Sequence, residues 1–391
     1  MTAEQRQYRA AIVGCGGMGR NHAHALVAMP DVTLVGLSDV IPETLERAGN
    51  EVEIDLAQRY LDFETMLEEA QPEFLVVATQ APQHAALTIA AAKRGIHVLC
   101  EKPLALNLAE ADAMVKACAD AGVVLAVNHL RRMTPASTLA RDLIAAGEIG
   151  DILAVDIHDK GGRPVGNTLM EMATHYFDEA RFLLSTRVLT DGRSADELGW
   201  VYAHLSTGVG ASAHPATPAE IMPSQVAKPT DRDCGLVLGD RGTVLLGFAG
   251  EVQGVARFHN LPKADASYDG IDVIGTAGSL AIRGGFLKQL YRRRGHTFME
   301  SDPWQPVAIP NSAAYFAQDN RQASRWLCQA MMRDLIAAAA EGREHISSGR
   351  DGVISLESLM AVYVSYRQGC PVTLPLADRR HPLNVWQEEA A

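Results

Sequence analysis

Three ionisable residues are spaced so that one face of a helix would carry all of them. Glu171, His175 and Asp178 stand at positions i, i+4 and i+7 of a helical stretch that begins near Thr168. At about 100° per residue, their side chains fall within about 60° of one another. A carboxylate one turn from an imidazole can orient it and stabilise its charge, so His175 could act as a general base or acid. The alternative is an ion-paired stripe on the protein surface.

A lysine follows one of the predicted buried strands. The strand covers residues 96–100, and the sequence Glu101-Lys102-Pro103 comes directly after it. In a parallel sheet, ligands lie beyond the carboxyl ends of the strands. The ammonium group of Lys102 could therefore stabilise negative charge that develops on a substrate oxygen. The alternative is a surface lysine in a turn before the proline.

A glycine-rich loop near the start of the chain predicts a binding site for a dinucleotide. An apolar run, residues 10–13, leads into Gly14, Gly16 and Gly19. The first glycine permits a tight turn, the second lets the backbone approach a pyrophosphate, and the third lets the next helix pack against the strand. The amino terminus of that helix offers free N–H groups to phosphate. The candidate cofactor-binding residues in this loop are Gly14, Gly16, Gly17, Met18 and Gly19.

An aspartate ends the second predicted strand, residues 32–38. Asp39 follows Gly19 at about the 20-residue distance at which a carboxylate accepts hydrogen bonds from the adenosine ribose. Its charge would repel the 2′-phosphate of NADP, and residues 40–42 include no arginine to neutralise it. The sequence therefore predicts NAD as the cofactor, with a solvated turn aspartate as the alternative.

Alternating strands and helices continue through the first third of the chain. Strands are predicted at 74–78, 96–100 and 123–127, and helices up to Arg94 and over 108–121. This alternation predicts a doubly wound parallel sheet, or Rossmann fold, with ligands beyond the carboxyl ends of its strands. The further cofactor candidates at those ends are Thr79, His84, Glu101 and Lys102. For His84, a core or capping role is an open alternative.

The pattern changes after Asp151, where predicted strands follow one another and are separated by turns. Such a succession predicts an α+β domain built on a largely antiparallel open β-sheet. We therefore expect an NAD-binding domain over 1–128 and a substrate-binding and oligomerisation domain over 129–391. The segment 206–233 is rich in Ser, Pro, Ala and Thr, and we expect a loop or insertion near a site or an interface. The predicted strands are 152–157, 200–205, 236–238, 244–248, 254–258, 271–274 and 279–282, and the late helices are 323–341 and 352–368.

Composition excludes several classes of function. The 391 residues carry a net charge of −12 without a Lys/Arg-rich tract, which argues against binding to nucleic acid or to anionic membranes. The sequence shows neither a secretion signal nor an apolar run of about 20 residues, so we expect a cytoplasmic protein. The six cysteines and thirteen histidines form no metal-ligand pattern, so no metal is predicted. His22 could lie near the cofactor or pack on the loop.

The sequence resembles the Gfo/Idh/MocA oxidoreductases, a family that includes glucose–fructose oxidoreductase and inositol dehydrogenase. The resemblance covers almost the whole chain and is carried by five motifs. They are the glycine loop, Glu101-Lys102-Pro103, the segment 128–135, the helix with Glu171, His175 and Asp178, and residues 348–352 before the last long helix. The resemblance implies that Lys102, Glu171 and His175 are catalytic, with Asp178 as a further candidate. Glu171 stands where inositol dehydrogenases have an aspartate and is one methylene longer, and Asp178 could orient His175 instead.

The resemblance also implies the reaction. Hydride would pass from a carbinol carbon of a sugar, polyol or related carbohydrate to NAD, while His175 accepts the hydroxyl proton and Lys102 positions the oxygen. An NAD-dependent glycoside hydrolase that oxidises its substrate transiently is the alternative, and an NAD-sensing regulator is disfavoured by the presence of Lys102 and His175. Family members pair face to face, so a homodimer or homotetramer is expected. The candidate substrate-binding residues are Lys102, Asn128, Arg131, Lys160, Arg163 and His175.

Overall fold

The computed structural model divides the chain into two compact units. Unit 1 comprises residues up to Leu130 together with 321–353, and unit 2 comprises most of the remainder. The return of 321–353 to unit 1 was not foreseen in the sequence. The structure describes residues 6–164, 166–188, 192–206, 217–224, 233–239, 241–261, 268–295 and 301–391.

Unit 1 is built on a sheet of six parallel strands in the order β3-β2-β1-β4-β5-β6. The central strands are runs of buried aliphatic and β-branched residues, as expected where helices cover both faces. The strand order reverses between β1 and β4, and ligands bind at such a switch point in doubly wound folds. The predicted Rossmann fold is thus confirmed. The strands are β1 Tyr8–Val13, β2 Val32–Ser38, β3 Arg59–Tyr60, β4 Phe74–Val77, β5 His97–Cys100 and β6 Leu125–Val127.

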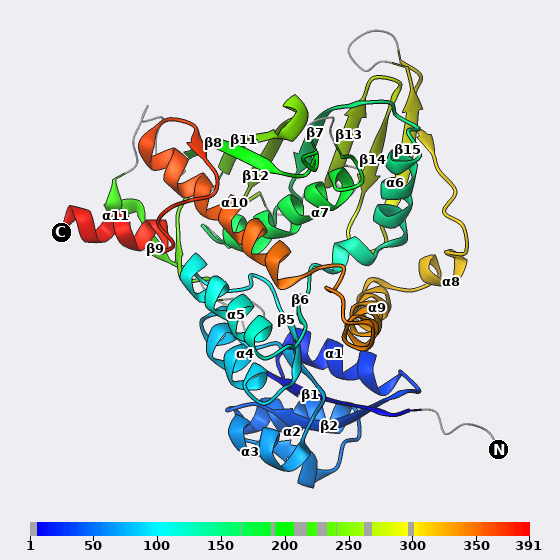
Figure 1. Ribbon diagram of the computed structural model, residues 1–391, viewed down its shortest axis with the longest axis vertical. Helices are drawn as coiled ribbons and strands as arrows, with labels where there is room; N and C mark the ends of the chain where they lie inside the picture. Colours follow the sequence, from blue (N-terminus) through cyan, green and yellow to red (C-terminus); the bar gives the residue numbers. More distant parts are fainter. Residues whose placement is uncertain are drawn as a thin grey trace. The chain divides into compact units, whose positions relative to one another are not determined.

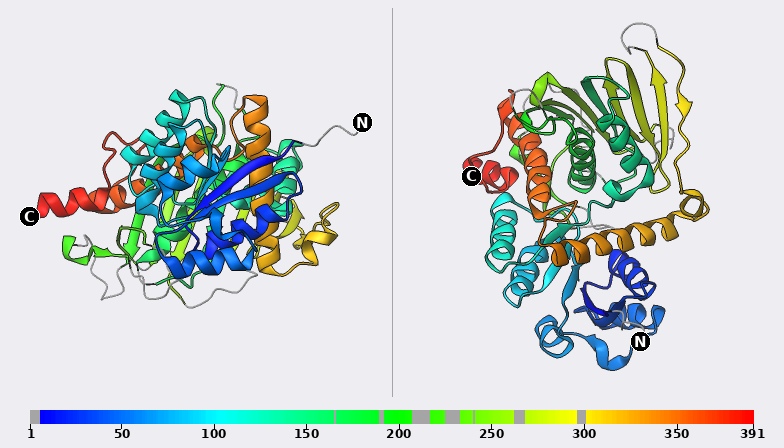
Figure 2. Two further views of the ribbon diagram at one scale, coloured as in Figure 1. Left: turned by 90° about the horizontal axis from the view of Figure 1, so that it is seen from below. Right: turned by 45° about the vertical axis from the view of Figure 1, so that its right-hand side comes forward.

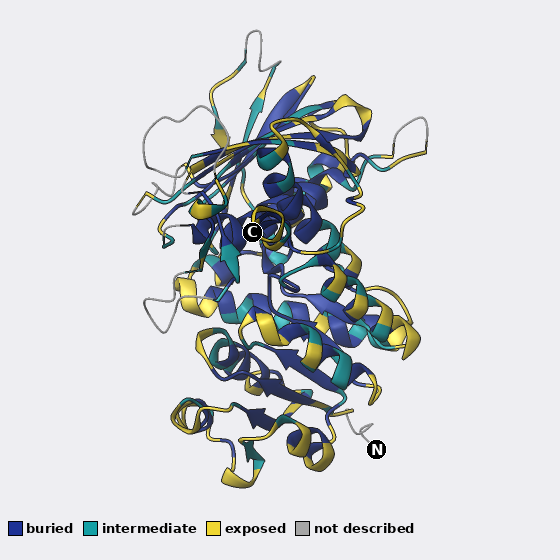
Figure 3. Ribbon diagram, turned by 90° about the vertical axis from the view of Figure 1, so that its left-hand side faces the viewer, coloured by how far each residue is buried: buried dark blue, intermediate teal, exposed yellow. Residues whose placement is uncertain are grey.

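Five helices connect these strands (Figure 1). The crossovers run in opposite directions on either side of β1 and β4, so right-handed connections place α1 and α4 on opposite faces. The strands between the helices are buried, whereas the outer helix faces are exposed (Figure 3). Asp62 caps α3 by accepting from Thr65 N, and Asn107 caps α5 by accepting from Glu110 N. The helices are α1 Gly17–Val27, α2 Pro42–Glu51, α3 Phe63–Ala70, α4 His84–Ala92 and α5 Leu108–Asp120.

A long helix from late in the sequence completes unit 1. The helix α9, Asn320–Glu341, lies beside α1 (Figures 1 and 2) and is joined to it by side-chain hydrogen bonds. The helix α10, Gly349–Gln368, begins in unit 1 and continues in unit 2. A Cβ atom on Gly349 would come within 2.8 Å of Leu125. This close packing against β6 explains why the segment belongs to unit 1.

Unit 2 is built on a nine-stranded sheet in the order β16-β15-β14-β13-β7-β12-β11-β8-β17. Neighbouring strands are antiparallel except β7 and β12, so the predicted α+β domain is confirmed. The strand β15 was not predicted from the sequence, because its charged residues do not form a hydrophobic pattern. The strands are β7 Ile152–His158, β8 Leu198–Ser206, β11 Arg241–Phe248, β12 Gln253–His259, β13 Gly270–Gly275, β14 Gly278–Arg283, β15 Gln289–Arg294, β16 Gln305–Pro306 and β17 Val372–Thr373.

The segment 206–233 lies largely outside the described residues. Its described part holds a short 3₁₀ turn, Pro218–Glu220, and the strand β9, Met222–Pro223. The predicted strand at 236–238 is present as β10, Leu236–Val237. It pairs with β9 in a separate two-stranded sheet instead of joining the large one.

The helix that carries the predicted catalytic residues is buried in unit 2. It consists of a π-helical turn, Leu169–Ala173, followed directly by α7, Thr174–Leu184. The other helices of this unit, besides most of α10, are α6 Pro135–Ala145, α8 Ala313–Phe316 and α11 Pro382–Ala390.

Within the described ranges, no helix is both long enough and apolar enough to cross a membrane. The same residues contain no group of three or more His, Cys, Asp or Glu side chains that could hold a metal ion. The six cysteines, all of which lie within the described ranges, form no disulfide bond.

Candidate active site

The glycine loop packs closely against the protein at Gly14 and Gly19 and has open space at Gly16 and Gly17. Gly14 has a φ of +88°, and a Cβ atom there would come within 2.5 Å of Thr79 N. A Cβ atom on Gly19 would lie 1.8 Å from Gly14 O, so both positions require glycine. Gly16 and Gly17 have open space instead, with no atom within 4 Å of an added Cβ. Helix α1 begins there without a side-chain cap, and this arrangement fits a bound diphosphate.

Asp39 is placed at the same loop by the end of β2. Its Oδ2 accepts a hydrogen bond of 2.7 Å from Cys15 N, and its Oδ1 accepts one of 2.9 Å from Ile41 N. The carboxylate therefore stabilises the loop through these two hydrogen bonds. The distance between Gly19 and Asp39 in the sequence did not reveal this role. Carboxylate oxygens have further lone pairs, so Asp39 can also accept from ribose hydroxyls when NAD is bound.

We expect Asp39→Asn to weaken NAD binding by about tenfold or more, because a hydrogen bond to a charged acceptor is lost. The preference for NAD over NADP should narrow at the same time, since the amide no longer repels a 2′-phosphate. Calorimetric titration with both dinucleotides measures this effect. Asp120→Asn, which alters an exposed carboxylate paired with Lys116, is the matched control. Unchanged discrimination between NAD and NADP would contradict the role given to Asp39.

A buried polar cluster supports the sequence Glu101-Lys102-Pro103. Glu101 Oε1 accepts from Asn128 Nδ2 at 2.7 Å and lies 3.1 Å from His22 Nε2. All three side chains are buried. Burial alone would lower the pKa of His22, but Cys328 and Glu101 beside it raise this pKa to about 10. His22 is thus a buried residue of α1 and a partner of Glu101.

His84 connects the loops that follow β4 and β5. Its Nδ1 lies 2.9 Å from Pro103 O, and its Nε2 lies 3.2 Å from Thr79 O. Lys102, between Glu101 and Pro103, is itself only 4% exposed. The contacts of His84 and Glu101 therefore fix the backbone on both sides of Lys102.

His175 is the one residue from 166 to 184 that is not buried. His175 is thus partly exposed on an otherwise buried helix, although its Nδ1 atom is buried. Glu171 lies in the π-helical turn, so the 100° spacing of a regular helix applies from Thr174 onward and not between Glu171 and His175. Glu171 Oε2 is 3.1 Å from Arg163 Nε, and its Oε1 accepts from Asn167 Nδ2 at 3.3 Å.

Arg132 forms a bidentate ion pair with the carboxylate of Asp178. Arg132 Nε donates to Oδ2 at 2.8 Å, and Nη2 donates to Oδ1 at 2.6 Å. Ser355 Oγ also donates to Oδ1 at 3.4 Å. Asp178 is fully buried, so this pair anchors the middle of α7.

The predicted substrate-binding cations lie around Tyr176. Its hydroxyl donates to Asp269 Oδ1 at 2.6 Å and accepts from Lys160 N at 3.2 Å. The guanidinium carbon of Arg131 lies 4.1 Å from the centre of the Tyr176 ring. Burial, together with the positive charges of Arg163 and Arg131, lowers the pKa of Lys160 to about 8. Its amine can therefore take up or release a proton near that pH.

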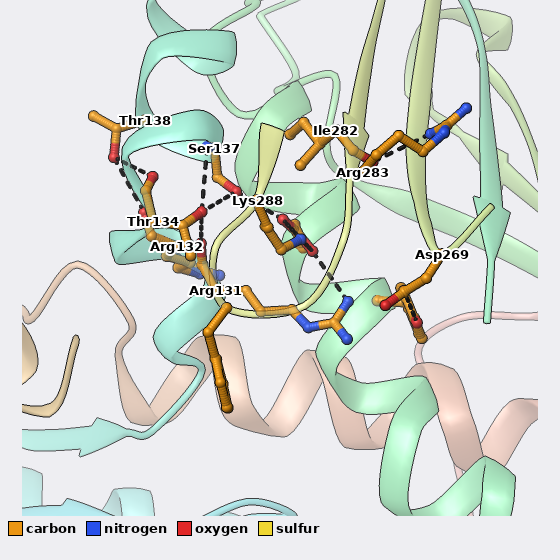
Figure 4. A network of polar contacts seen from close by, with 12 residues as sticks. Arg131, Arg132, Thr134, Ser137, Thr138, Asp269, Ile282, Arg283 and Lys288 are labelled. Carbon is orange, nitrogen blue, oxygen red and sulfur yellow. Dashed lines mark hydrogen bonds and ion pairs between the residues drawn. The ribbon is translucent and has the colours of Figure 1, made fainter. Parts of the chain in front are cut away.

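Behind this cluster lies a buried ionic network that the sequence did not reveal (Figure 4). Glu179 accepts from Lys288 Nζ at 2.5 and 2.7 Å, from Ser137 Oγ at 2.7 Å and from Arg131 Nη1 at 3.3 Å. Burial opposes the charge on Glu179, but Lys288 and Arg131 hold its pKa below the usual range. One feature of the sequence could have indicated this network. Glu179 is a carboxylate among the apolar residues of α7, and a buried carboxylate needs a buried partner.

Comparisons with known proteins agree with this arrangement. Residues 8–129 match a family model described as an oxidoreductase family with an NAD-binding Rossmann fold. D-apiose dehydrogenase of Paraburkholderia graminis is 27% identical over 407 residues, which cover 97% of this chain and 93% of that protein. Myo-inositol 2-dehydrogenase of Thermotoga maritima is 30% identical over 188 residues, or 46% of this chain and 56% of that protein.

A solved structure shares the fold over nearly the full length. Levoglucosan dehydrogenase in complex with NADH aligns with a TM-score of 0.73 at 23% identity, covering 95% of this chain and 100% of that one. The Rossmann sheet and the mixed second sheet therefore form the combined fold that the sequence resemblance predicted. Residues 8–129 thus form the NAD-binding Rossmann domain of the Gfo/Idh/MocA oxidoreductase family.

Proposed function

We propose that the protein is an NAD-dependent dehydrogenase that oxidises a hydroxyl group of a sugar or polyol. The observation that carries this proposal is His175, a partly exposed histidine on an otherwise buried helix. The names of the relatives support the substrate class, because they are dehydrogenases of apiose, inositol and levoglucosan. These names do not favour the alternative of an NAD-dependent glycoside hydrolase.

In this proposal each site residue has a stated task. Bound NAD supplies the hydride acceptor. His175 accepts the proton of the substrate hydroxyl, and Lys102 stabilises the negative charge that develops on the same oxygen. Lys160 and Arg163 bind further hydroxyl oxygens as hydrogen-bond donors.

The remaining candidates act through their neighbours. Glu171 holds Arg163 by the ion pair described above, and Asn128 holds Glu101 beside Lys102. Arg131 and Asp178 stabilise α7, which carries His175, through Glu179 and Arg132. We call these positioning residues, since the contacts described above are with protein groups.

We further propose that the enzyme works in the cytoplasm as a homodimer or homotetramer without binding nucleic acid. The net charge of −12 supports the last point. Exposed apolar side chains on neighbouring strands β8 and β11 support association: Trp200 is 39% exposed and Leu245 is 37% exposed.

The test is incubation of the purified protein with NAD and a panel of aldoses, polyols and aryl glycosides. We expect NADH to accumulate with an aldose or polyol, and His175→Asn to lower kcat by about 10²- to 10⁴-fold. His204→Asn, an exposed histidine on β8, is the matched control. Aglycone release without NADH would favour the hydrolase instead, and unchanged turnover by His175→Asn would contradict the role of this residue.

A further inference from the structure

Four arginines line a cavity of unit 1 that none of the assignments above explains. The cavity has a volume of about 380 Å³. Arg20 reaches it from α1, Arg47 from α2, and Arg321 and Arg325 from α9. Gly17, at the start of α1, also lines it, so the cavity extends to the phosphate-binding end of that helix.

The charge of this cavity is strongly positive. Glu51 is the one carboxylate among its lining residues, and it already pairs with Arg20 at 2.7 Å and with Arg47 at 3.1 Å. Four guanidinium groups and one carboxylate leave an excess of three positive charges. Arg325 Nε is buried and has no hydrogen-bond partner among the described residues. A concave site with such an excess attracts an anion that accepts hydrogen bonds.

The contacts between α1 and α9 set the direction of the two helices. Asn21 Nδ2 donates to Ser324 Oγ at 2.6 Å, and one turn later Gln329 Nε2 donates to Ala25 O at 3.1 Å. Later residues of α1 thus meet later residues of α9, so the helices run in the same direction. Arg321, one turn before Arg325, is consequently on the side of the amino terminus of α1.

The geometry points to Arg321 and Arg325 as ligands of the phosphate groups of NAD. The open space over Gly16 and Gly17 leaves room for the diphosphate, and the free N–H groups of α1 face the same anion. Guanidinium groups bind phosphate oxygens through paired hydrogen bonds. Helix α9, which lies some 300 residues after the glycine loop in sequence, therefore completes the cofactor site. This inference rests on NAD as the cofactor and holds for any carbohydrate substrate.

The test measures NAD binding without any carbohydrate, so it is independent of the proposed reaction. We expect the double variant Arg321→Gln/Arg325→Gln to raise the Kd of NAD by about 10- to 100-fold, because charge-assisted hydrogen bonds are lost. The affinity for adenosine, which has no phosphate, should stay the same. Inorganic pyrophosphate should compete with NAD in the unchanged protein and lose this effect in the variant.

Arg333→Gln, at an exposed arginine further along α9, is the matched control. A thermal unfolding curve of the double variant that matches the control shows that α9 is still packed. An unchanged Kd of NAD in the folded variant would overturn the inference. An equal loss of adenosine affinity would also overturn it, since the arginines would then act on the fold of the site and not on phosphate.

Discussion

Replacing Lys102 by methionine lowers kcat by about 10²- to 10³-fold, the usual cost of removing one group that stabilises charge on a reacting oxygen. The methionine keeps the apolar stem, and His84 still joins the loop to Thr79 through Pro103. NAD affinity should therefore remain close to that of the unchanged protein. Steady-state kinetics and a binding titration on the same sample measure both quantities.

Two further variants sharpen this test. Lys93→Met removes an exposed lysine near the end of α4 and should leave kcat unchanged. Lys102→Arg should not restore turnover, because a planar guanidinium does not replace a compact ammonium group. If Lys102→Met keeps full turnover on a sugar or polyol, the residue does not act on the reacting oxygen.

The largest expected effect on stability is at Glu179. Glu179→Ala should lower the free energy of unfolding by about 3–5 kcal/mol, because it leaves the buried charges of Lys288 and Arg131 without their carboxylate. The pKa of Glu179 lies below its usual range, so its contribution is present above the pKa of the unfolded chain and is lost as the pH falls through the folded value. Denaturant unfolding at neutral and at acidic pH measures both effects.

Two further variants serve as controls for Glu179→Ala. One breaks an ion pair at the surface, and the other removes the buried charge of Lys288. Glu148→Ala breaks an exposed pair with Arg292 and should cost about 0–1 kcal/mol. Adding Lys288→Met to Glu179→Ala should recover part of the loss, since one unpaired buried charge is removed. A loss below about 1 kcal/mol for Glu179→Ala would show that the network does not stabilise unit 2 as described.

The sequence predicted the elements whose pattern is local. The strand at 32–38 was predicted with its observed limits because β-branched and apolar residues end there at Asp39. The glycine positions followed from backbone requirements that no other residue meets at Gly14 and Gly19. The family, the fold of both domains and the NAD cofactor were thereby foreseen.

Features that depend on distant residues could not be predicted in this way. The π-helical turn at Leu169–Ala173 has no signature in residue spacing, so the face shared by Glu171 and His175 was derived from the wrong helix geometry. The three partners of Glu179 are 42, 48 and 109 residues away in sequence. The return of α9 to unit 1 depends on contacts such as that between Asn21 and Ser324, which only the folded chain brings together.

Transfer of a hydride from the carbohydrate to NAD can be followed with an isotope label. An active sugar or polyol from the panel is deuterated at the carbinol carbon, and the NADH formed with unlabelled NAD is analysed by mass spectrometry. We expect one deuterium atom in each NADH molecule, because the hydride comes from the carbinol carbon. NADH without deuterium, or product formation with the label retained in the carbohydrate and no net NADH, would contradict it.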